Sequence, residues 1–479
     1  MPFSLTDSPA FSWQFLESYL RRYDAHAVRH LELLGEVRSR LDALEPGGNS
    51  DDSPPFSRGD DEAASRGSRT AESSIVDRLE RLRYQLLNER AAALSDEDLR
   101  AADELDRMYA VLVGRRTPGG RQARRSLWNP DFAADAVRRL ERCLDPAMPL
   151  EELTESARRV TEEHFPGDSG NASEKSARHR VLLYAPLYLS SYCVNHCLYC
   201  HFKYDNPTTR IHLTPRQAVE EAEYLAAQGM RHILLVAGDY PRWTGVDYYV
   251  SVVEALRRRF AAQWAVEIAA QSTSGYARLS AAGVLGVTLY QETYDFDRYA
   301  VLHPRGPKTH FDWRLEALER AAEGGIRRLG LGILLGTAPV LEDARALVRH
   351  AEYLRRRFPR CTLAVSLPRL HCPPEGFTVP HPVDDETFIR LYCGLRHALP
   401  DAELVLSTRE TAALRELLAG VCVTQLSAGS STAPGGYGDR AAGRSVTGGE
   451  QFPVGDERPA EQVVQALRRQ GLAVVWESA

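Results

Sequence analysis

The sequence predicts an α/β protein whose main part is a (β/α)8 barrel of the TIM type, with an added helical region at its N-terminus. Two observations support this prediction. From Val181 onward, eight short apolar runs alternate with helical patterns, as the parallel strands and crossover helices of such a barrel do. Several of these runs, such as ILLVA at 233–237, are apolar throughout, which is typical of strands covered on both faces.

Residues 1–125 are expected to form a helical appendage. Leucines recur at helical spacing before the middle of this region and again after it. Between these parts, residues 46–73 are rich in proline, glycine, serine and charge, so they cannot bury enough apolar surface to become ordered. Residues 114–125, GRRTPGGRQARR, form a basic and flexible joint. Both segments are predicted to be disordered linkers.

Residues 126–180 are expected to lead into the barrel as helices, residues 181–428 to form the barrel, and residues 429–479 to form a lid or tail. Strands are expected near 181–189, 232–237, 264–270, 286–291, 328–335, 361–367, 402–407 and 422–427. Helices are expected near 215–229, 246–260, 275–283, 311–325, 340–357, 385–398 and 409–419. The first of these helices is well marked, because Thr214, Pro215 and Gln217 form a capping box with proline at its favoured position.

Composition limits the possible classes of function. The net charge of −6 is mild and argues against a nucleic-acid partner. No run of about 18 apolar residues is present, so no membrane span is expected. The stretch MPFSLTDSPAFSW lacks the basic and apolar parts of a secretory signal. Eight cysteines, three of them close together, indicate a reducing compartment and not a disulfide framework, so a cytoplasmic location is expected.

The most informative segment is YCVNHCLYCHFKYDN, in which Cys193, Cys197 and Cys200 stand in a C-x3-C-x2-C spacing. Three thiolates this close can ligate three corners of one 4Fe–4S cube and leave the fourth iron open. They lie just past the first predicted strand, at the end of a barrel where chemistry gathers. A zinc site completed by His196 or His201 is the alternative, and the lack of a second cysteine pair favours the cluster.

The stretch APLYLSSYCVNHCLYC resembles the radical S-adenosylmethionine (SAM) enzymes, and more narrowly their aromatic amino acid lyase branch. That branch includes the tyrosine lyases of the thiazole pathway and of hydrogenase maturation, and tryptophan lyases. The resemblance covers the chain from about Leu127 to the C-terminus. It implies a 4Fe–4S cluster, SAM as cofactor and an amino acid substrate. It further implies cleavage of the Cα–Cβ bond of tyrosine to p-cresol and 2-iminoacetate through a 5′-deoxyadenosyl radical, for thiamine thiazole synthesis.

The same resemblance assigns residues to SAM. Gly238 and Asp239 end the second predicted strand, where relatives carry Gly-Glu, so aspartate shortens the side chain by one methylene. The segment YQETY at 290–294 is similar to a part of the lyases that faces SAM and substrate, and small glycines in the fifth strand would let an adenine approach. The residues expected to bind SAM are Tyr199, Gly238, Asp239, Gln291, Glu292 and Gly332.

Other strand ends resemble the substrate site of the lyases. Ser366 and Arg369 stand in an S-x-P-R segment that holds the amino acid in those enzymes, and a guanidinium offers a fork for a carboxylate. Arg369 is therefore predicted to clamp the substrate carboxylate, with Glu292 as a second catalytic residue. The residues expected to bind substrate are Ser366, Arg369, Ser407, Arg409 and Ser427.

The tail resembles the end of the thiazole-pathway enzyme, a region of the biotin and thiamin synthesis-associated type. No cysteine follows Cys422, so a second cluster like that of the hydrogenase-maturation enzyme is not expected. The resemblance also implies a reduced flavodoxin- or ferredoxin-type electron donor and a thiazole synthase or other pathway partner. Two alternatives stay open here: a related lyase acting on tryptophan or another amino acid, and a non-catalytic accessory protein that retains the fold. Three departures keep the related lyase open: Gly-Asp in place of Gly-Glu, His201 where relatives usually have glycine, and the first 125 residues.

Overall fold

The computed structural model describes residues 13–23, 27–42, 126–167, 177–443 and 449–478, together with single positions between 75 and 108. The predicted linkers at 46–73 and 114–125 lie outside the described residues. The chain divides into two compact units, Met1–Gln122 and Ala123–Ala479. In the part of the chain that the model covers, no helix is both long and apolar enough for a membrane span.

The first unit contains the helices α1 (Trp13–Tyr23) and α2 (Ala27–Asp42). Both present leucines on the face that is buried, as the helical spacing of the sequence requires. Positions after residue 74 that are helical also join this core, at intervals of three or four residues. The buried residues of this core are Leu16, Tyr19, Leu20, Leu33, Leu34, Val37, Leu79, Leu82, Ala101, Leu105 and Met108.

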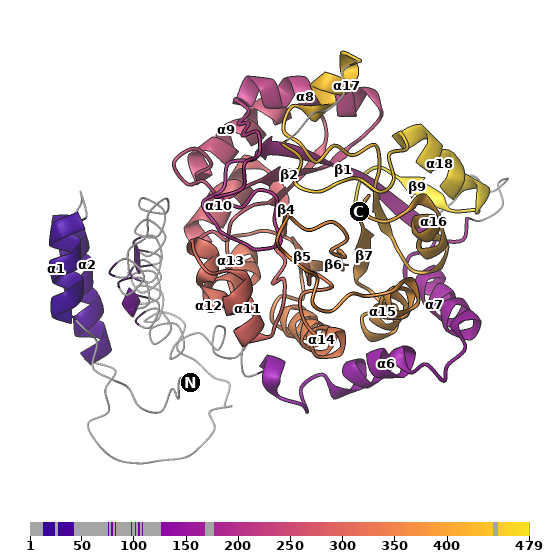
Figure 1. The fold of residues 1–479 in the computed structure, drawn as a ribbon, viewed down its shortest axis with the longest axis horizontal. Coiled ribbons are helices and arrows are strands. Elements are labelled where there is room, and N and C mark those ends of the chain that lie inside the picture. Colours follow the sequence, from indigo (N-terminus) through magenta and orange to yellow (C-terminus); the bar gives the residue numbers. More distant parts are fainter. Residues whose placement is uncertain are drawn as a thin grey trace, which may run out of the picture. The chain divides into compact units, whose positions relative to one another are not determined.

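The second unit is built around a closed barrel of eight parallel strands (Figure 1). The strands are β1 (Arg180–Ser190), β2 (His232–Ala237), β3 (Gln263–Glu267), β4 (Val284–Thr288), β5 (Arg328–Gly332), β6 (Thr362–Ser366), β7 (Glu403–Leu406) and β8 (Gln425–Ser427). Each strand pairs with the next, and β1 pairs in parallel with both β2 and β8, which closes the ring. The predicted (β/α)8 fold is confirmed.

The strands β3, β4 and β5 each end three residues before the predicted end of the strand. The ladder between β4 and β5 stops at Thr288 and Gly330, and only an isolated bridge between Glu292 and Ile333 follows. Glu292 has a φ of 71°, which no strand residue adopts, so the chain turns away from the sheet here. A ninth strand, β9 (Ala473–Val475), pairs with the start of β1. Its three residues are too short a run to be predicted.

Helices surround the barrel, as Figure 1 shows. They are α8 (Pro215–Ala227), α9 (Val246–Arg259), α10 (Thr273–Ala282), α11 (Phe296–Leu302), α12 (Phe311–Leu315), α13 (Ala317–Glu323), α14 (Val340–Arg357), α15 (Asp385–Ala398) and α16 (Ala412–Val421). The capping box of α8 is present, with the Gln217 amide N–H donating to Thr214 Oγ1. The single helix predicted at 311–325 is divided between α12 and α13 at Glu316, and α11 was not predicted.

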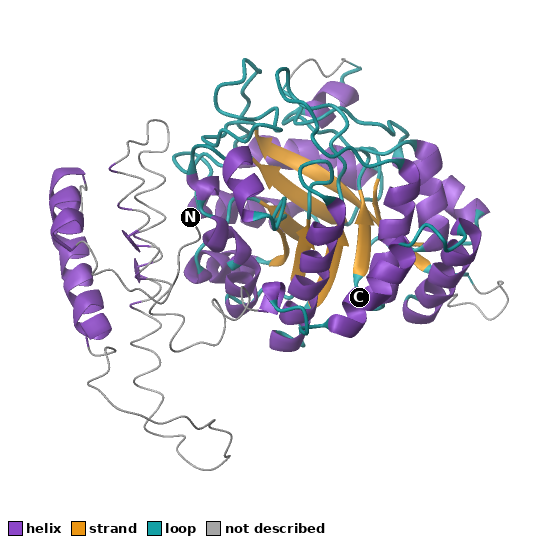
Figure 2. Cartoon of the chain, turned by 60° about the horizontal axis from the view of Figure 1, so that its bottom comes forward, coloured by secondary structure: helices purple, strands orange, loops and turns teal. Residues whose placement is uncertain are grey.

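Two helices precede the barrel, α6 (Ala134–Leu144) and α7 (Leu150–His164), and both pack against α15. Two more follow it, α17 (Gly436–Ala441) and α18 (Ala460–Arg469). Long loops gather at one end of the barrel, at the top of Figure 2. Because the strands are parallel, their C-terminal ends meet at one mouth, and the predicted site segments follow the ends of β1, β2, β4, β5, β6, β7 and β8.

Candidate active site

The three-cysteine loop follows β1 and is fastened to the neighbouring loops. The backbone N–H of Val194 donates to the Asp239 carbonyl at 2.8 Å, and that of Leu198 donates to the Leu302 carbonyl at 3.1 Å. A Cβ at Gly238 would lie 2.3 Å from the Tyr192 carbonyl oxygen, so only glycine allows the loop after β2 to approach this closely. The close packing of the two loops therefore explains why glycine stands at position 238, before Asp239.

The cysteine sulfurs meet N–H donors, which suits thiolates that hold a cluster. Asn195 Nδ2 lies 3.8 Å from Cys193 Sγ, and the Phe202 amide N lies 3.4 Å from Cys200 Sγ. Burial raises the pKa of Cys193 to about 11 and that of Cys197 to about 12. The metal-free thiols are therefore protonated near neutral pH, and iron binding must displace those protons.

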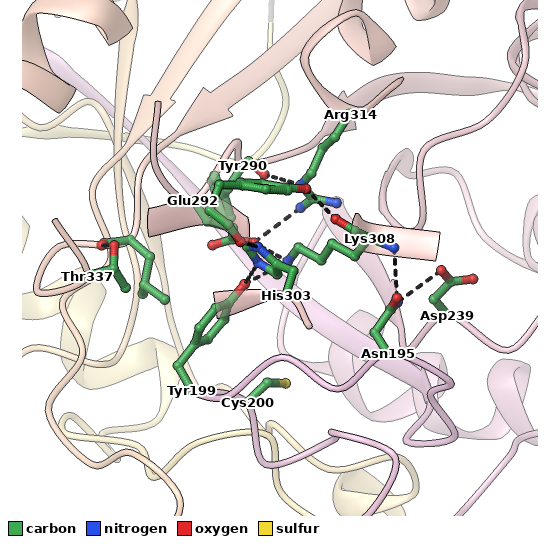
Figure 3. A network of polar contacts seen from close by, with 12 residues as sticks. Asn195, Tyr199, Cys200, Asp239, Tyr290, Glu292, His303, Lys308, Arg314 and Thr337 are labelled. Atoms are coloured by element: carbon green, nitrogen blue, oxygen red, sulfur yellow. Dashed lines mark hydrogen bonds and ion pairs between the residues drawn. The ribbon is translucent and has the colours of Figure 1, made fainter. Parts of the chain in front are cut away.

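A buried polar network lies beside the cysteine loop, and Figure 3 shows its members converging on Lys308. Lys308 Nζ lies 2.5 Å from Glu292 Oε1 and donates to the Tyr199 hydroxyl at 2.8 Å. The backbone N–H of the same lysine donates to Asn195 Oδ1 at 2.8 Å. One lysine thus joins the cysteine loop, through Tyr199 and Asn195, to the loop after β4, through Glu292.

His303 fixes the direction of the hydrogen bonds around Tyr199. Its Nδ1 lies 2.7 Å from the Tyr299 carbonyl oxygen, which can only accept, so Nδ1 carries the proton. Its Nε2 then accepts from the Tyr199 hydroxyl at 2.8 Å. Burial and the nearby Lys308 hold the pKa of His303 well below its ordinary value, which agrees with a neutral ring. Tyr199 is thereby oriented from both sides.

Glu292 is the anionic centre of the network. Arg314 Nη2 lies 3.2 Å from Glu292 Oε1, and Arg314 Nε donates to the Tyr290 carbonyl at 2.6 Å. Burial opposes ionisation of Glu292, but Lys308 and Arg314 outweigh it and lower its pKa. Its left-handed backbone, with φ 71°, is rare for a side chain with a Cβ and is typical of functional sites.

Asp239 is connected to the network through Asn195. Asn195 Nδ2 donates to Asp239 Oδ2 at 3.0 Å while Asn195 Oδ1 accepts from the Lys308 backbone. Burial raises the pKa of Asp239 to about 6, and the bond from Asn195 only partly offsets it. Asp239 is therefore brought to the same mouth as Glu292, with its second oxygen without a hydrogen bond among the described residues.

Glu267, at the end of β3, is a carboxyl group that was not among the predicted site residues. Burial and the charge of Glu292 raise its pKa to about 7. Arg409, Arg314 and Lys308 act on it in the opposite direction, which places it within electrostatic reach of the same cations. Glu267 is thus, after Asp239, a second carboxyl group of the site with a pKa raised toward neutral pH.

The residues expected to hold SAM fit a polar ligand. Gln291 is 3 % exposed, and its Nε2 has no hydrogen-bond partner among the described residues, although its backbone N–H donates to the Gly332 carbonyl. Such an orphaned donor is costly unless a ligand accepts from it. A Cβ at Gly332 would lie 2.2 Å from the Ser366 carbonyl oxygen, so this part of the wall needs glycine. Ser366 lines an interior cavity together with Tyr184 and Tyr290.

Arg369, predicted to clamp the substrate, already has carboxylate partners. Its guanidinium forms a two-pronged pair with Glu410, lies 2.8 Å from Asp385 Oδ1, and packs over the Phe388 ring. Glu410 is 2 % exposed and also lies 3.1 Å from His371 Nε2. In this geometry the fork of Arg369 is turned toward Glu410, so a direct contact with substrate would require that pair to open. The clamp stays a prediction.

Arg409 is differently placed. Its guanidinium packs 3.5 Å over the Phe452 ring, and no carboxylate partner for it is found in the described part of the chain. Its charge reaches Glu267, Glu292, Tyr188 and Tyr290. Ser407 Oγ accepts from the Arg409 backbone N–H at 3.4 Å, and Ser427 is buried at the end of β8. Ser407 is therefore the predicted serine that contacts Arg409.

Comparisons with known proteins agree with this geometry. Residues 187–351 match the model of the Radical SAM superfamily, and residues 366–473 match the Biotin and Thiamin Synthesis associated domain. The chain is 34 % identical over 329 residues to 2-iminoacetate synthase of Escherichia coli (strain K12), a match that covers 68 % of this chain and 82 % of that one. The chain belongs to the radical SAM superfamily. It is a radical SAM enzyme related to 2-iminoacetate synthase, as the sequence predicted.

Solved structures show the same relation. The FeFe-hydrogenase maturase HydG from Carboxydothermus hydrogenoformans is 28 % identical with a TM-score of 0.63, over 85 % of this chain and 86 % of that one. Methylornithine synthase is 21 % identical with a TM-score of 0.54, over 70 % and 93 %, and shares the fold. Membership of the superfamily implies a 4Fe–4S cluster and SAM, and it favours the cluster over the zinc site that the spacing also allowed.

Several site residues of this radical SAM enzyme were missed from sequence. Asn195 lies inside the cysteine spacing, and Lys308 is one of only three lysines in the chain, which was a usable signal. Arg314 and His303 lie in the same stretch as Lys308 and were not singled out. The stretch HPRGPKTHFDWRLEAL at 303–318 resembles the lyases, but which of its side chains reach the site depends on how the segment folds across the mouth.

Proposed function

We propose that this enzyme cleaves the Cα–Cβ bond of tyrosine to give p-cresol and 2-iminoacetate, the precursor of a thiamine thiazole. The observation that carries the proposal is the 34 % identity to 2-iminoacetate synthase over 329 residues, which covers 68 % of this chain and 82 % of that one. The likeness to HydG at 28 % identity and a TM-score of 0.63 supports the same branch.

Cys193, Cys197 and Cys200 would hold the cluster, and the cluster with SAM would supply the radical that starts bond cleavage. The chain itself supplies placement. Tyr199 and Lys308 tie the cysteine loop to Glu292, so the groups on either side of the reacting atoms are held by one network. Holding reactants in near-attack geometry is the main rate contribution that a protein can make to such chemistry.

The charge of the mouth supports an amino acid ligand. Lys308 and Arg314 share a single carboxylate, Glu292, and Arg409 adds a further cation. Glu267 and Asp239 have raised pKa values, about 7 and about 6, so they offset these cations only in part. Unpaired buried charge is unfavourable. The carboxylate groups of SAM and of an amino acid substrate are groups with which these cations would pair.

Arg409 is the better-placed clamp for the substrate carboxylate, and Arg369 is proposed to position the loop after β7 through Glu410. Three features support this assignment. Arg409 has no carboxylate partner among the described residues, it is held flat by Phe452, and its charge reaches the barrel interior. Arg369 has two carboxylate partners already.

The reaction is tested with the full-length protein, reconstituted anaerobically with iron and sulfide and then supplied with SAM, a reductant and one aromatic amino acid at a time. Tyrosine should give p-cresol together with 5′-deoxyadenosine, measured by mass spectrometry. Changing Cys193, Cys197 and Cys200 to alanine should remove about four irons per chain, the content of one 4Fe–4S cluster. Cys372→Ala, an exposed cysteine, is the matched control. Indole products from tryptophan and none from tyrosine would contradict the tyrosine assignment.

The clamp is tested by tyrosine binding to the oxidised enzyme with SAM present, a state in which no turnover occurs. Arg409→Leu should weaken binding roughly tenfold to a hundredfold, because a charge-assisted fork contributes about 1.5–3 kcal/mol. Arg369→Leu alone would leave Glu410 buried and unpaired, so the informative variant is Arg369→Leu with Glu410→Leu. Wild-type affinity in that double variant would exclude Arg369 as the clamp, and lost affinity there with normal affinity in Arg409→Leu would exclude Arg409.

Partners follow from the same proposal. A reduced flavodoxin- or ferredoxin-type protein would supply the electron, and a thiazole synthase or another pathway enzyme would receive the product. All eight cysteines are free, which suits the reducing, cytoplasmic setting that the sequence predicts.

A further inference from the structure

Residues 451–456, here called the strap, pass over the barrel mouth and are tied down at both ends. The Gln451 backbone N–H donates to the Thr432 carbonyl at 3.0 Å, and Thr432 Oγ1 donates to the Phe452 carbonyl at 2.7 Å. At the other end, the Gly455 N–H donates to the Thr408 carbonyl at 2.7 Å, and the Asp456 carboxylate pairs with Arg415. The strap is therefore a fixed part of the mouth.

The side chain of Gln451 points from the strap toward the cysteine loop. Its Oε1 accepts from the Tyr188 hydroxyl at 2.7 Å, and its Nε2 lies 4.0 Å from Cys200 Sγ. This direction follows from chemistry, because a cluster-ligating thiolate can only accept and must face the amide nitrogen. The Tyr188 hydroxyl then meets the amide oxygen and keeps the side chain from rotating.

His201 holds the same glutamine from a second side. Its ring, directly after Cys200, hydrogen-bonds to the Gln451 backbone. This is the position where the lyases usually have glycine, so the departure noted in the sequence creates a contact between the cysteine loop and the strap. Gln451 is thus positioned by Tyr188 from β1, Thr432 from the loop after β8, and His201.

We propose that Gln451 donates an N–H hydrogen bond to the Cys200 thiolate and raises the reduction potential of the cluster. The positive end of the N–H dipole lies toward the sulfur, so it stabilises the extra electron of the reduced cluster more than the oxidised state. The inference rests on the proposed function only for the presence of the cluster. Gln451 is a positioning residue that acts through the cysteine ligand.

Gln451 differs from the other donors to the cysteine sulfurs in its origin. Asn195 and Phe202 belong to the cysteine loop itself and the Asp239 backbone to the adjoining loop after β2, whereas Gln451 lies 251 residues further along the chain than Cys200. Its hydrogen bond therefore forms only when the strap is in place. The hydrogen bond thus couples the cluster site to a segment of the C-terminal part of the chain.

The test measures the midpoint potential of the cluster by an EPR-monitored redox titration of the reconstituted full-length protein, without SAM or substrate. Gln451→Leu should give a lower potential than the wild type at the same iron content. Gln451→Glu, which keeps the oxygen for Tyr188 but replaces the donor, should lower it further. Tyr188→Phe should lower it less, and combined with Gln451→Leu it should add nothing. Gln465→Leu, a glutamine on α18 that bonds only to Glu461, is the matched control.

An unchanged potential in Gln451→Leu with full iron content would overturn the inference. If Gln451→Leu fails to assemble a cluster, Gln451→Glu decides, because it removes the N–H donor, and an unchanged potential there overturns the inference as well. The redox titration contains no substrate and is therefore independent of the proposed reaction. If Gln451→Leu lowers the midpoint potential as expected while the wild-type enzyme forms no p-cresol from tyrosine, the proposed function is refuted and the role of Gln451 stands. A wild-type protein that binds no iron would overturn both.

Discussion

The raised pKa of Glu267 predicts an unusual dependence of stability on pH. Glu267→Gln replaces a carboxyl group by a neutral amide of the same shape at the end of β3. Burial and then Glu292 raise the folded-state pKa from the ordinary 4.5 to about 7. Because the folded state binds this proton more tightly than the unfolded state, ionisation destabilises the wild-type protein. Its stability should fall as pH rises from 4.5 to about 7 and then level off.

The magnitude follows from the two pKa values. At 1.36 kcal/mol for each pKa unit, the difference between 4.5 and about 7 amounts to about 3 kcal/mol above pH 8, as an upper bound. At pH 5 the folded carboxyl is mostly protonated and the difference shrinks to about 1 kcal/mol. The Gln variant does not ionise, so it should be more stable than the wild type by these amounts.

The assay is urea unfolding of the metal-free, reduced proteins at pH 5 and pH 8, followed by circular dichroism. Glu254→Gln on α9, whose carboxylate is 54 % exposed, is the matched control and should show little difference between the two pH values. If Glu267→Gln is no more stable than the wild type at pH 8, or if its advantage is greater at pH 5, the reasoning about Glu267 is wrong.

Three other predictions concern the site and the first unit. Asp239→Ala should weaken SAM binding about tenfold in equilibrium dialysis, because a carboxylate held by Asn195 is lost. If its affinity for SAM equals that of the exposed control variant Asp247→Ala, the segment is a simple turn. Gly238→Ala should cost about 1–3 kcal/mol in unfolding free energy, since its Cβ would meet the Tyr192 carbonyl at 2.3 Å, whereas Gly35→Ala, with open space, should not destabilise. Removal of residues 1–122 should leave a protein that still assembles the cluster, and an insoluble product would show that the first unit is required for folding.

The fold class could be predicted from the sequence, and so could a three-cysteine loop suited to a 4Fe–4S cluster. Parallel strands buried on both faces leave continuous apolar runs, and crossover helices leave a 3.6-residue period, so the eight β/α units can be read directly. Cys193, Cys197 and Cys200 lie within one loop, so their spacing in the sequence is enough to predict that they bind one cluster together. The capping box at Thr214 was predictable for the same reason, since all its partners lie within one turn.

Contacts between residues far apart in the sequence could be known only from the folded chain. Lys308 reaches Tyr199 across 109 positions of the chain, and Gln451 reaches Cys200 across 251, so no local pattern could pair them. The same holds for Arg369, which as a motif residue looked free to bind substrate until the fold placed Glu410 beside it. Electrostatics sums over every charge near a site, whatever its place in the sequence, and for that reason the raised pKa of Glu267 could be found only after the barrel had closed around it.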